Sequence, residues 1–542
     1  NVFALCISFI AGEIQSAAFI VVMLAFADLL EWHTSRRTHN AVEELLKLKP
    51  ERATREQNDA LVEIPADEVR AGDILVVVPG ARVPVDGVVV FGDALVNESS
   101  MTGESLPVRK IIGDSVFGLT LNETGVLKIR ATRVGKDSTI EQMATLIRKA
   151  AGNKSHSEKL ADTFALYFLP FVIALGAVVY VVTRNISMTA AIFLVSCADD
   201  MAVAIPLAVT ASLGNAARRG LIIKGGEWLD TISRVKTIVL DKTGTLTYGS
   251  FSVGAVHIET EVTEKEFWRA IAIAEKFSQH SIGRALFNET AKFIKIVPDP
   301  DEFKVIEGGG AWVRIESDTI MVGNKNYFSS VGISVSSENE ATLGVIVHVA
   351  INKKYIGYVQ LADLPRPEAR ASIIALRKLG VERIIMFTGD NENVANSVAK
   401  ALGIEEYRAS MKPEDKLREL EMLACKHGPI AMVGDGINDA PALARAHIGI
   451  AMGKGGTAVA VEAADIVILS DDLSRLPEAI EVGRRTMGVI RSDTVIWAAS
   501  NFIGFGLVLT GVAGPVLAAA YNFATDFFPL LNSARLFQKK VS

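Results

Sequence analysis

Acidic and hydroxyl side chains follow three strand-like runs in the second half of the chain. The runs reach Asp241 in TIVLD, then Thr388, Gly389 and Asp390 in MFTGD, then Asp435, Asn438 and Asp439 in AMVGDGINDAP. Ligands and catalytic groups of open α/β sheets gather at the carboxyl ends of strands, so these side chains are expected to meet at one sheet edge. Asp241 is placed there as a nucleophile, because carboxylates form aspartyl-phosphate intermediates. Mg²⁺ prefers oxygen ligands shared with phosphates, which suits Asp241 and Asp435, and Lys416 in KPEDK is a candidate phosphate clamp.

Carboxylates also stand inside apolar runs. SCADDMAVAIPLAV contains Cys197, Asp199 and Asp200, and YNFATDFFPLL contains Asp526. A charge at the centre of a membrane span costs about 2.5–3.5 kcal/mol on insertion scales, so such residues are interpreted first as functional. Adjacent helix positions lie about 100° apart, so only one of Asp199 and Asp200 need face a pathway. The alternative, a buried ion pair, is disfavoured because the two apolar runs that carry these carboxylates contain no Lys or Arg.

The composition indicates a membrane protein with large water-soluble parts. The chain has 542 residues, of which 49% are hydrophobic and 22% charged, and its mean hydropathy is +0.30. This length has room for three or four domains. The net charge of −6 gives no reason to expect a nucleic acid partner. The three cysteines are far apart and form no CxxC pair, so neither a disulfide framework nor a zinc site is indicated.

Apolar segments come in three groups, and each group is broken once. They predict six spans of about 20 residues in three hairpins, the first span truncated. We place the hairpins at 1–33, 161–213 and 491–542. Basic residues flank the spans beside both large polar segments, which indicates that these segments are cytoplasmic and that the protein lies in the cell membrane. The apolar start at Asn1 leads us to expect that the numbered chain begins inside a longer protein.

The polar segments differ in pattern. Residues 34–160 contain alternations such as DILVVVPGARVPVDGVVV, which are typical of strands joined by turns. Residues 214–247 and 361–490 alternate strand-like runs with helical stretches, as an α/β domain with a parallel sheet does. Residues 248–360 lack that alternation, so we expect a separate α+β domain inserted into the α/β domain.

Together, DKTGTLT, TGD and GDGINDAP resemble the phosphorylation-domain motifs of P-type ATPases, which have a haloacid-dehalogenase-like fold, and MTGES at 101–105 resembles their actuator loop. The resemblance implies an actuator domain at 34–160, a phosphorylation domain at 214–247 and 361–490, and a nucleotide-binding domain at 248–360. It implies ATP and Mg²⁺ as cofactors, with Glu104 positioning the water that hydrolyses the aspartyl phosphate. The implied Mg²⁺ ligands are Asp241, Thr243 and Asp435. The implied catalytic residues are Asp241, Lys242, Thr243, Glu104, Thr388, Gly389, Asp390, Lys416, Asn438 and Asp439.

The heavy-metal branch of that family is the most similar. Only two spans follow the phosphorylation domain, and LADTFALYFLP and NSARLF are similar to segments of that branch. The nucleotide domain departs from the usual Ser-Glu-His-Pro, because Gln279 and Ser281 flank His280. By the resemblance, His280 contacts the adenine, and Gly308 and Gly310 in IEGGGAWV match the glycine-containing loop beside it.

The membrane motif departs further from that branch, which carries Cys-Pro-Cys or a close variant before a second proline. Aligning that proline on Pro206 places Cys197, Ala198 and Asp199 on the motif, so a carboxylate replaces one thiolate. Asn501 matches an asparagine of the fifth span, and NFATDFFP resembles the pattern around the cation-binding aspartate of calcium-type pumps. The implied ligands of the transported cation are Cys197, Asp199, Asp200, Asp526 and Asn501.

Ligand softness favours a divalent transition metal. One sulfur and up to three carboxylates suit Zn²⁺ or Mn²⁺ better than Cu⁺. We therefore expect an ATP-driven cation pump that works through an aspartyl phosphate at Asp241, as a monomer in the lipid bilayer. A pump for protons or for a hard cation such as Ca²⁺ or Mg²⁺ is an alternative, because a buried carboxylate can load and release protons. A membrane-tethered phosphatase of the same fold is a second alternative.

Overall fold

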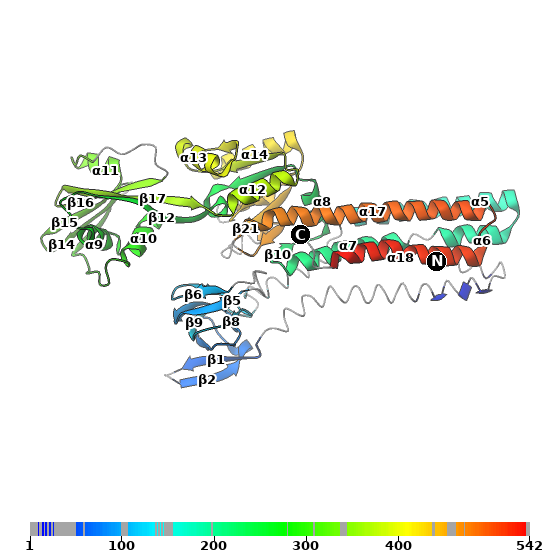
Figure 1. Ribbon diagram of the computed structural model, residues 1–542, viewed down its shortest axis with the longest axis horizontal. Coiled ribbons are helices and arrows are strands. Elements are labelled where there is room, and N and C mark those ends of the chain that lie inside the picture. Colours follow the sequence, from blue (N-terminus) through cyan, green and yellow to red (C-terminus); the bar gives the residue numbers. More distant parts are fainter. Residues whose placement is uncertain are drawn as a thin grey trace.

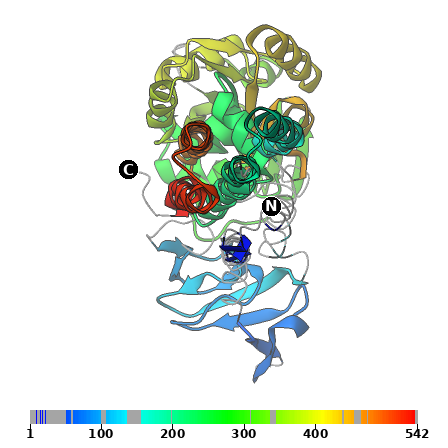
Figure 2. The same ribbon diagram turned by 90° about the vertical axis from the view of Figure 1, so that its right-hand side faces the viewer.

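The computed structural model describes residues 50–57, 60–98, 107–135, 155–196, 199–278, 280–306, 309–335, 344–435, 439–452, 462–470 and 472–537, and isolated positions elsewhere. Figure 1 shows an elongated molecule, with a bundle of long helices at one end and sheets at the other. Figure 2 looks along the helices and shows the β-rich region of residues 50–135 to one side of them.

Five described helices form the bundle: α5 (His156–Thr183), α6 (Ile186–Val195), α7 (Asp199–Ala217), α17 (Arg475–Leu509) and α18 (Pro515–Ala534). Local signals set their ends. Ser155 Oγ accepts a hydrogen bond from Glu158 N at 3.0 Å in a capping box that starts α5. Arg184 adopts a left-handed φ of 53° after α5, and Asn185 Oδ1 accepts from Met188 N at 3.1 Å to start α6. The break predicted between the third and fourth spans therefore lies where the helices separate.

The fourth predicted span differs from expectation, because it is two helices rather than one. α6 ends at Val195, and α7 begins at Asp199. The Ser196 hydroxyl donates to the carbonyl oxygen of Ile192 one turn back. Such back-bonding by serine competes with helix propagation and bends helices. Helix α6 thus ends just before the motif, although the motif contains no proline.

The bundle of six spans is not confirmed by the described residues. Two helical segments are long and apolar enough to cross a membrane, Leu166–Thr183 and Arg475–Leu509, and two shorter apolar helices cover Ile186–Val195 and Val203–Ala217. The first predicted hairpin, at 1–33, lies almost wholly outside the described residues.

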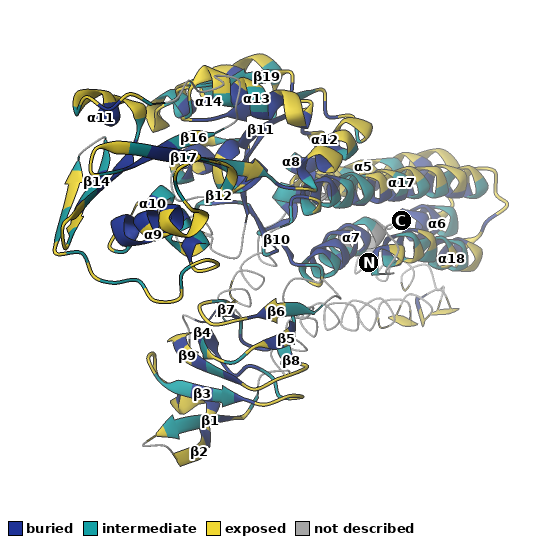
Figure 3. Ribbon diagram, turned by 60° about the vertical axis from the view of Figure 1, so that its left-hand side comes forward, coloured by how far each residue is buried: buried dark blue, intermediate teal, exposed yellow. Residues whose placement is uncertain are grey.

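A seven-stranded sheet adjoins the bundle. Its order is β10 (Leu221–Ile223), β22 (Ile466–Ile468), β21 (Ile448–Met452), β20 (Ile430–Gly434), β11 (Thr237–Asp241), β18 (Arg383–Phe387) and β19 (Glu406–Arg408). All neighbours are parallel except β10 and β22. Helices flank it at α8 (Gly226–Arg234), α12 (Ala369–Lys378), α13 (Glu392–Leu402), α14 (Pro413–His427) and α15 (Ala440–Arg445). Figure 3 shows that the strands are buried and that the helices around them are more exposed. Strands that are buried on both faces have continuous apolar sequences, as these strands do.

A six-stranded antiparallel sheet extends from the first sheet (Figure 1). Its order is β12 (Thr247–Ile258), β17 (Lys354–Pro365), β16 (Val345–Ile351), β15 (Asp318–Gly323), β14 (Gly310–Ile315) and β13 (Glu302–Ile306). It carries the helices α9 (Glu264–Glu275), α10 (Ser281–Thr290) and α11 (Lys325–Ser330). β12 leads out of the seven-stranded region and β17 leads back, with Thr247 paired with Pro365 at their base.

The β-rich region contains two antiparallel sheets. One has the order β2 (Ala60–Pro65), β1 (Arg52–Gln57), β3 (Ile74–Val77), β9 (Leu127–Arg133), β4 (Asp86–Phe91) and β7 (Ser115–Val116). The other has the order β6 (Val108–Lys110), β5 (Ala94–Asn97) and β8 (Leu121–Asn122). A shared apolar core, including Leu75, Val96 and Leu127, joins them.

Gly504 lies where three helices of the bundle pack closely, so a larger side chain there should destabilise the bundle. A Cβ at this position of α17 would lie 2.4 Å from Val195 Cγ1 of α6 and 3.1 Å from Tyr521 Cε1 of α18. Gly504→Leu is therefore expected to lower the melting temperature in detergent by several degrees, because overpacking costs about 1–3 kcal/mol. Gly506→Leu is the matched control, since a Cβ there meets nothing within 4 Å. Equal melting temperatures for the two variants would contradict this packing.

Candidate active site

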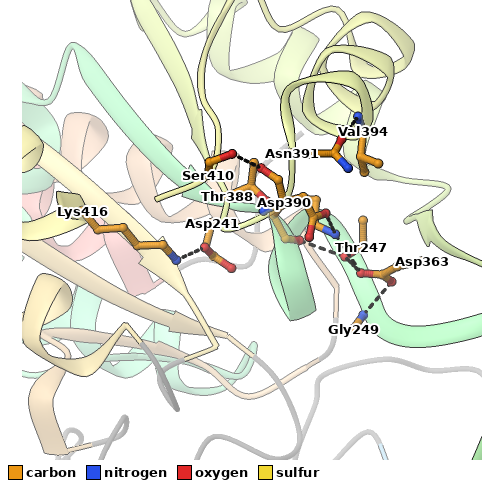
Figure 4. Close-up of polar contacts among 11 residues, drawn as sticks. Asp241, Thr247, Gly249, Asp363, Thr388, Asp390, Asn391, Val394, Ser410 and Lys416 are labelled. Carbon is orange, nitrogen blue, oxygen red and sulfur yellow. Dashed lines mark hydrogen bonds and ion pairs between the residues drawn. The ribbon is translucent and has the colours of Figure 1, made fainter. Parts of the chain in front are cut away.

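The edge of the seven-stranded sheet gathers most of the predicted catalytic residues. Asp241 is the last residue of β11, an interior strand between β20 and β18, and is 4% exposed. It pairs with Phe387 of β18, which Thr388 follows, and the next strand on the other side, β20, leads to Asp435. Parallel strands thus place all three side chains at one edge, as the sequence predicts. Figure 4 shows Asp241 facing Lys416, with Thr388 and Asp390 beside them.

Lys416 clamps the cluster. It lies in the first turns of α14, which Pro413 begins. Its Nζ donates to Asp241 Oδ1 at 2.5 Å and to Asp439 Oδ1 at 2.8 Å. All three residues are buried, so these charge-assisted hydrogen bonds are shielded from water and are among the stronger ones in a protein.

Burial and charge perturb both partners. Burial is the largest cause that raises the pKa of Asp241 to about 7; Asp439 and Asp435 raise it as well, whereas Lys416 lowers it. Burial alone would lower the pKa of Lys416, but the charges of Asp241 and Asp439 raise it above its ordinary value. The lysine therefore stays an ammonium at neutral pH, and Asp241 is poised between its acid and carboxylate forms.

A second lysine organises the other side of the cluster. Lys242 Nζ lies 2.6 Å from Asp390 Oδ2 and 3.5 Å from Asp363 Oδ2. Asp390 N donates to Thr388 Oγ1 at 3.0 Å, which orders the TGD turn. Asp363 accepts from Thr247 Oγ1 at 2.6 Å and from Gly249 N at 3.0 Å, so it joins this loop to the base of β12.

The loop after Asp241 requires glycine at position 244. Gly244 has a φ of 76°, and a Cβ there would lie 2.6 Å from Asp435 Oδ2. The Asp435 carboxylate thus packs directly on this loop. Arg366 holds the same loop through two hydrogen bonds: its Nε donates to Thr245 O at 2.8 Å and its Nη2 donates to Gly244 O at 3.0 Å.

Sequence reasoning missed Asp363 and Arg366. Asp363 lies near the end of the returning strand β17 and Arg366 directly follows it, in DLPRP at the predicted boundary of the inserted domain. A carboxylate and an arginine at the end of a strand, on either side of a proline, were the available signal. Asp363 contacts Lys242, and Arg366 contacts the loop after Asp241, so this end of β17 belongs to the active site.

The donor set fits Mg²⁺. The carboxylates of Asp435 and Asp439 both lie close enough to Asp241 to raise its pKa, and the Lys416 ammonium lies beside Asp241 and Asp439. The surplus of negative charge and the oxygen donors suit a hard divalent cation. Thr243, the third predicted Mg²⁺ ligand, lies in the same loop with an extended backbone.

The predicted nucleotide residues lie apart from this cluster, in the six-stranded region. His280 caps α10, and its Nδ1 accepts from Ile282 N at 3.3 Å while the side chain is exposed. Gly310 begins β14 with a φ of 152°, and a Cβ there would lie 2.1 Å from Val322 O. α10 packs on α9, and α9 packs on β14, which links the two positions. Glu275 at the end of α9 is buried, and burial raises its pKa; the sequence did not single it out.

Two predicted cation ligands are described in the bundle. Asp526 of α18 accepts from Asn522 Nδ2 at 3.3 Å. Asn501 of α17 is 6% exposed. Its Nδ2 donates to Trp497 O at 2.9 Å, and its Oδ1 has no hydrogen-bond partner among the described residues. Asn522, which is also buried, is a neighbour that sequence reasoning missed.

Several predicted positions are not described. Cys197, Glu104, Gly308 and Asn438 lie outside the described residues. Asp199 and Asp200 form the first residues of α7, but their side chains are not described.

Two family models match the chain. One, described as haloacid dehalogenase-like hydrolase, covers residues 235–447. This range begins just before β11, includes the inserted six-stranded region and ends just after α15. The other, described as the P-type ATPase actuator domain, covers residues 47–148 and therefore the β-rich region.

Relatives match almost the whole chain. A cadmium-transporting ATPase of Staphylococcus aureus is 31% identical over 98% of this chain and 76% of that protein. A copper-exporting P-type ATPase of Staphylococcus epidermidis is 33% identical over 97% of this chain and 68% of that protein. A crystal structure of a zinc-transporting PIB-type ATPase in the E2·Pi state is 30% identical, with a TM-score of 0.67 over 99% of this chain and 89% of that chain.

These matches agree with the geometry of the strand edge, where a buried aspartate meets a lysine and further carboxylates. By identity, coverage and fold, the chain belongs to the heavy-metal, or PIB, branch of the P-type ATPases, enzymes that couple ATP hydrolysis to cation transport.

Proposed function

We propose that this chain pumps a divalent transition metal, with Asp241 as the residue that ATP phosphorylates. The observation that carries the proposal is the buried Lys416 ammonium, which donates to both Asp241 and Asp439 at the end of β11. A membrane-tethered phosphatase is disfavoured, because the relatives that match nearly the whole chain are named as metal transporters.

In this proposal an Asp241 carboxylate oxygen attacks the γ-phosphorus of ATP, and the bond to the β–γ bridging oxygen breaks to release ADP. Phosphoryl transfer needs little covalent chemistry from the protein beyond positioning and charge neutralisation. Lys416 supplies positive charge directly at Asp241, and Lys242 supplies it beside Asp390. Bound Mg²⁺, held by Asp241, Asp435 and Thr243, would neutralise phosphate charge and favour the carboxylate form of Asp241. Thr388, Gly389, Asp390, Asn438 and Asp439 complete the proposed site.

The other domains act on this centre. We assign the six-stranded region to ATP binding, with His280, Gly308 and Gly310 beside the adenine. The β-rich region is proposed as the actuator, in which Glu104 positions the water that hydrolyses the phospho-Asp241. The bundle is proposed to have six spans in the cell membrane, with the sheets in the cytoplasm and one chain per pump.

The proposed cation site joins Asp526 and Asn501 with Cys197, Asp199 and Asp200. Its donors are mainly oxygens, and Asn522 adds a further amide next to Asp526. Oxygen-rich sites disfavour Cu⁺, and one sulfur still suits Zn²⁺, Cd²⁺ or Mn²⁺. The oxygen content also supports a second candidate, a pump for a hard cation or protons, which the choice of activating ion distinguishes.

Asp241→Asn tests the nucleophile. The amount of phosphoenzyme that the variant forms from labelled ATP is expected to be at least 100-fold lower than that of the wild type, because an amide cannot attack the γ-phosphorus. The measurement is acid-stable, hydroxylamine-sensitive labelling of the purified protein. Asp299→Asn is the control, since Asp299 is an exposed partner of Lys276. Persistent labelling of Asp241→Asn would assign the phosphate to another residue.

The raised pKa of Asp241 predicts a pH-dependent stability without Mg²⁺. This pKa is about 7 in the folded protein and about 3.9 in an unfolded chain. Unfolding therefore releases a proton between these values, so the stability contributed by the protonated form is lost as pH rises from 4 to 7. With EDTA present, the melting temperature of the wild type relative to Asp241→Asn should fall by several degrees from pH 5 to pH 8. A difference that stays constant with pH would refute the assigned pKa.

Removing a membrane carboxylate tests the transported ion. Asp526→Ala, like Asp199→Ala, is expected to raise the metal concentration for half-maximal ATPase activity at least tenfold, while phosphorylation by inorganic phosphate persists. Activity is measured across Zn²⁺, Cd²⁺, Mn²⁺, Cu⁺, Ca²⁺, Mg²⁺ and pH. Thr525→Val is the control, because the bonds of Thr525 Oγ1 among the described residues go to backbone oxygens of its own helix, those of Tyr521 and Asn522. Activation by Ca²⁺ or protons alone would favour the second candidate.

A further inference from the structure

A fully buried carboxylate in the bundle has no part in the chemistry proposed above. Asp493 of α17 is 0% exposed. It lies on the buried face of that helix, in a stripe formed by Thr486, Ile490, Asp493, Trp497 and Asn501. A buried carboxylate is costly unless hydrogen bonds compensate it, so its partners indicate what holds it there.

The partners of Asp493 come from α18 and extend to α7. Asn532 Nδ2 donates to Asp493 Oδ1 at 2.6 Å and to Ser492 Oγ at 2.7 Å. The Ser533 hydroxyl donates to Asp493 Oδ2 at 2.7 Å and lies 3.0 Å from the carbonyl oxygen of Ala204 in α7. Ser533 is also 0% exposed. One carboxylate thus connects three helices; Asp493 and Ser533 are fully buried, and Asn532 and Ser492 are partly exposed.

The same three helices carry the candidate cation ligands. Asn501 lies eight residues beyond Asp493 on α17, about 12 Å along the helix axis. Asp526 lies seven residues before Ser533 on α18, about 10 Å along that axis and on nearly the same face. Asp199 begins α7, five residues before Ala204. A shift of one helix at the Asp493 network would therefore change the distances among these ligands.

We propose that Asp493 is a positioning residue for the membrane cation site: through Asn532 and Ser533 it fixes α7, α17 and α18 relative to one another. The inference rests on the proposed function, because it needs a cation site shared by these helices. Asp493 itself is not a ligand in this account. Both of its oxygens accept hydrogen bonds from N–H or O–H groups, whose positive ends would face an incoming cation.

The hydrogen bonds rather than the charge carry this role, and two variants separate them. In Asp493→Asn the amide oxygen can accept from Asn532, and the amide N–H can donate to Ser533 Oγ, whose proton then bonds Ala204 O. Asp493→Leu removes both bonds to residue 493, so neither Asn532 nor Ser533 is held by α17 at this position. We measure the Zn²⁺ concentration for half-maximal ATPase activity of the full chain, the KM for ATP, and phosphorylation by inorganic phosphate.

Asp493→Leu is expected to raise the half-maximal Zn²⁺ concentration at least tenfold, with the KM for ATP and phosphorylation by phosphate within twofold of the wild type. Asp493→Asn is expected to stay within threefold on all three. An unchanged Zn²⁺ response in Asp493→Leu overturns the proposal. An equal loss in Asp493→Asn also overturns it, because the charge itself would then be used.

Two further variants keep the test decisive. If Asp493→Leu does not fold, Ser533→Ala removes the bond to Asp493 Oδ2 and with it the bridge to α7, while the bond from Asn532 stays. This variant should raise the half-maximal Zn²⁺ concentration about threefold; no change overturns the proposal. Thr486→Val breaks a single bond from α17 to Ser212 of α7 and should stay within twofold. A loss there as large as in Asp493→Leu would reveal general loosening and contradict the assigned role. If Zn²⁺ and every other metal fail to activate the wild type, the proposed function itself fails, and this inference falls with it.

Discussion

The burial of Asp241 among carboxylates is the constraint on which the site depends. Desolvation and the charges of Asp439 and Asp435 drive this carboxyl toward its neutral form, and Lys416 opposes them. Asp241 meets its neighbours because β11 lies between β18 and β20 and is parallel to both. The ends of those two strands lead to Thr388 and Asp435. The cost of burying the cluster is offset by paired hydrogen bonds to Lys416 and by the favourable packing of an apolar sheet. A divalent cation and a phosphoryl group are the ligands that such a surplus of negative charge and fixed ammonium groups can accommodate.

One helix connects this sheet to the membrane bundle. α17 is continuous for 35 residues. Near its start, Arg484 donates to the carbonyl oxygens of Ser233 and Val235 at the end of α8, just before β11. Farther along, the helix carries Asp493 and Asn501 on its buried face. Because α17 is one continuous helix with contacts at both ends, a rearrangement at the strand edge can be transmitted along it to the bundle.

The sequence predicted the strand edge well, because residues such as Asp241 and Asp435 directly follow apolar runs and their positions depend on local periodicity. Asp363 and Arg366 could not be found in that way, since Arg366 reaches Thr245 across 121 positions of the chain and only the return of β17 brings them together. The break after Val195 was also missed, because it depends on where the Ser196 hydroxyl bonds rather than on hydropathy. In the bundle, apolar composition predicts helices but not which polar side chains meet, so Asp526 was identified and its neighbour Asn522 was not. The contacts of Asp493 with Asn532 and Ser533 were beyond reach for the same reason.

Metal accumulation in sealed vesicles tests the central claim most directly. Purified protein is reconstituted with its ATP site facing outward, and uptake of Zn²⁺, Cd²⁺ and Mn²⁺ is followed after addition of Mg²⁺ and ATP. The account predicts ATP-dependent accumulation of at least one of these three metals, and none with Asp241→Asn. ATP hydrolysis that depends on Asp241 but moves none of the three metals into the vesicles would contradict it.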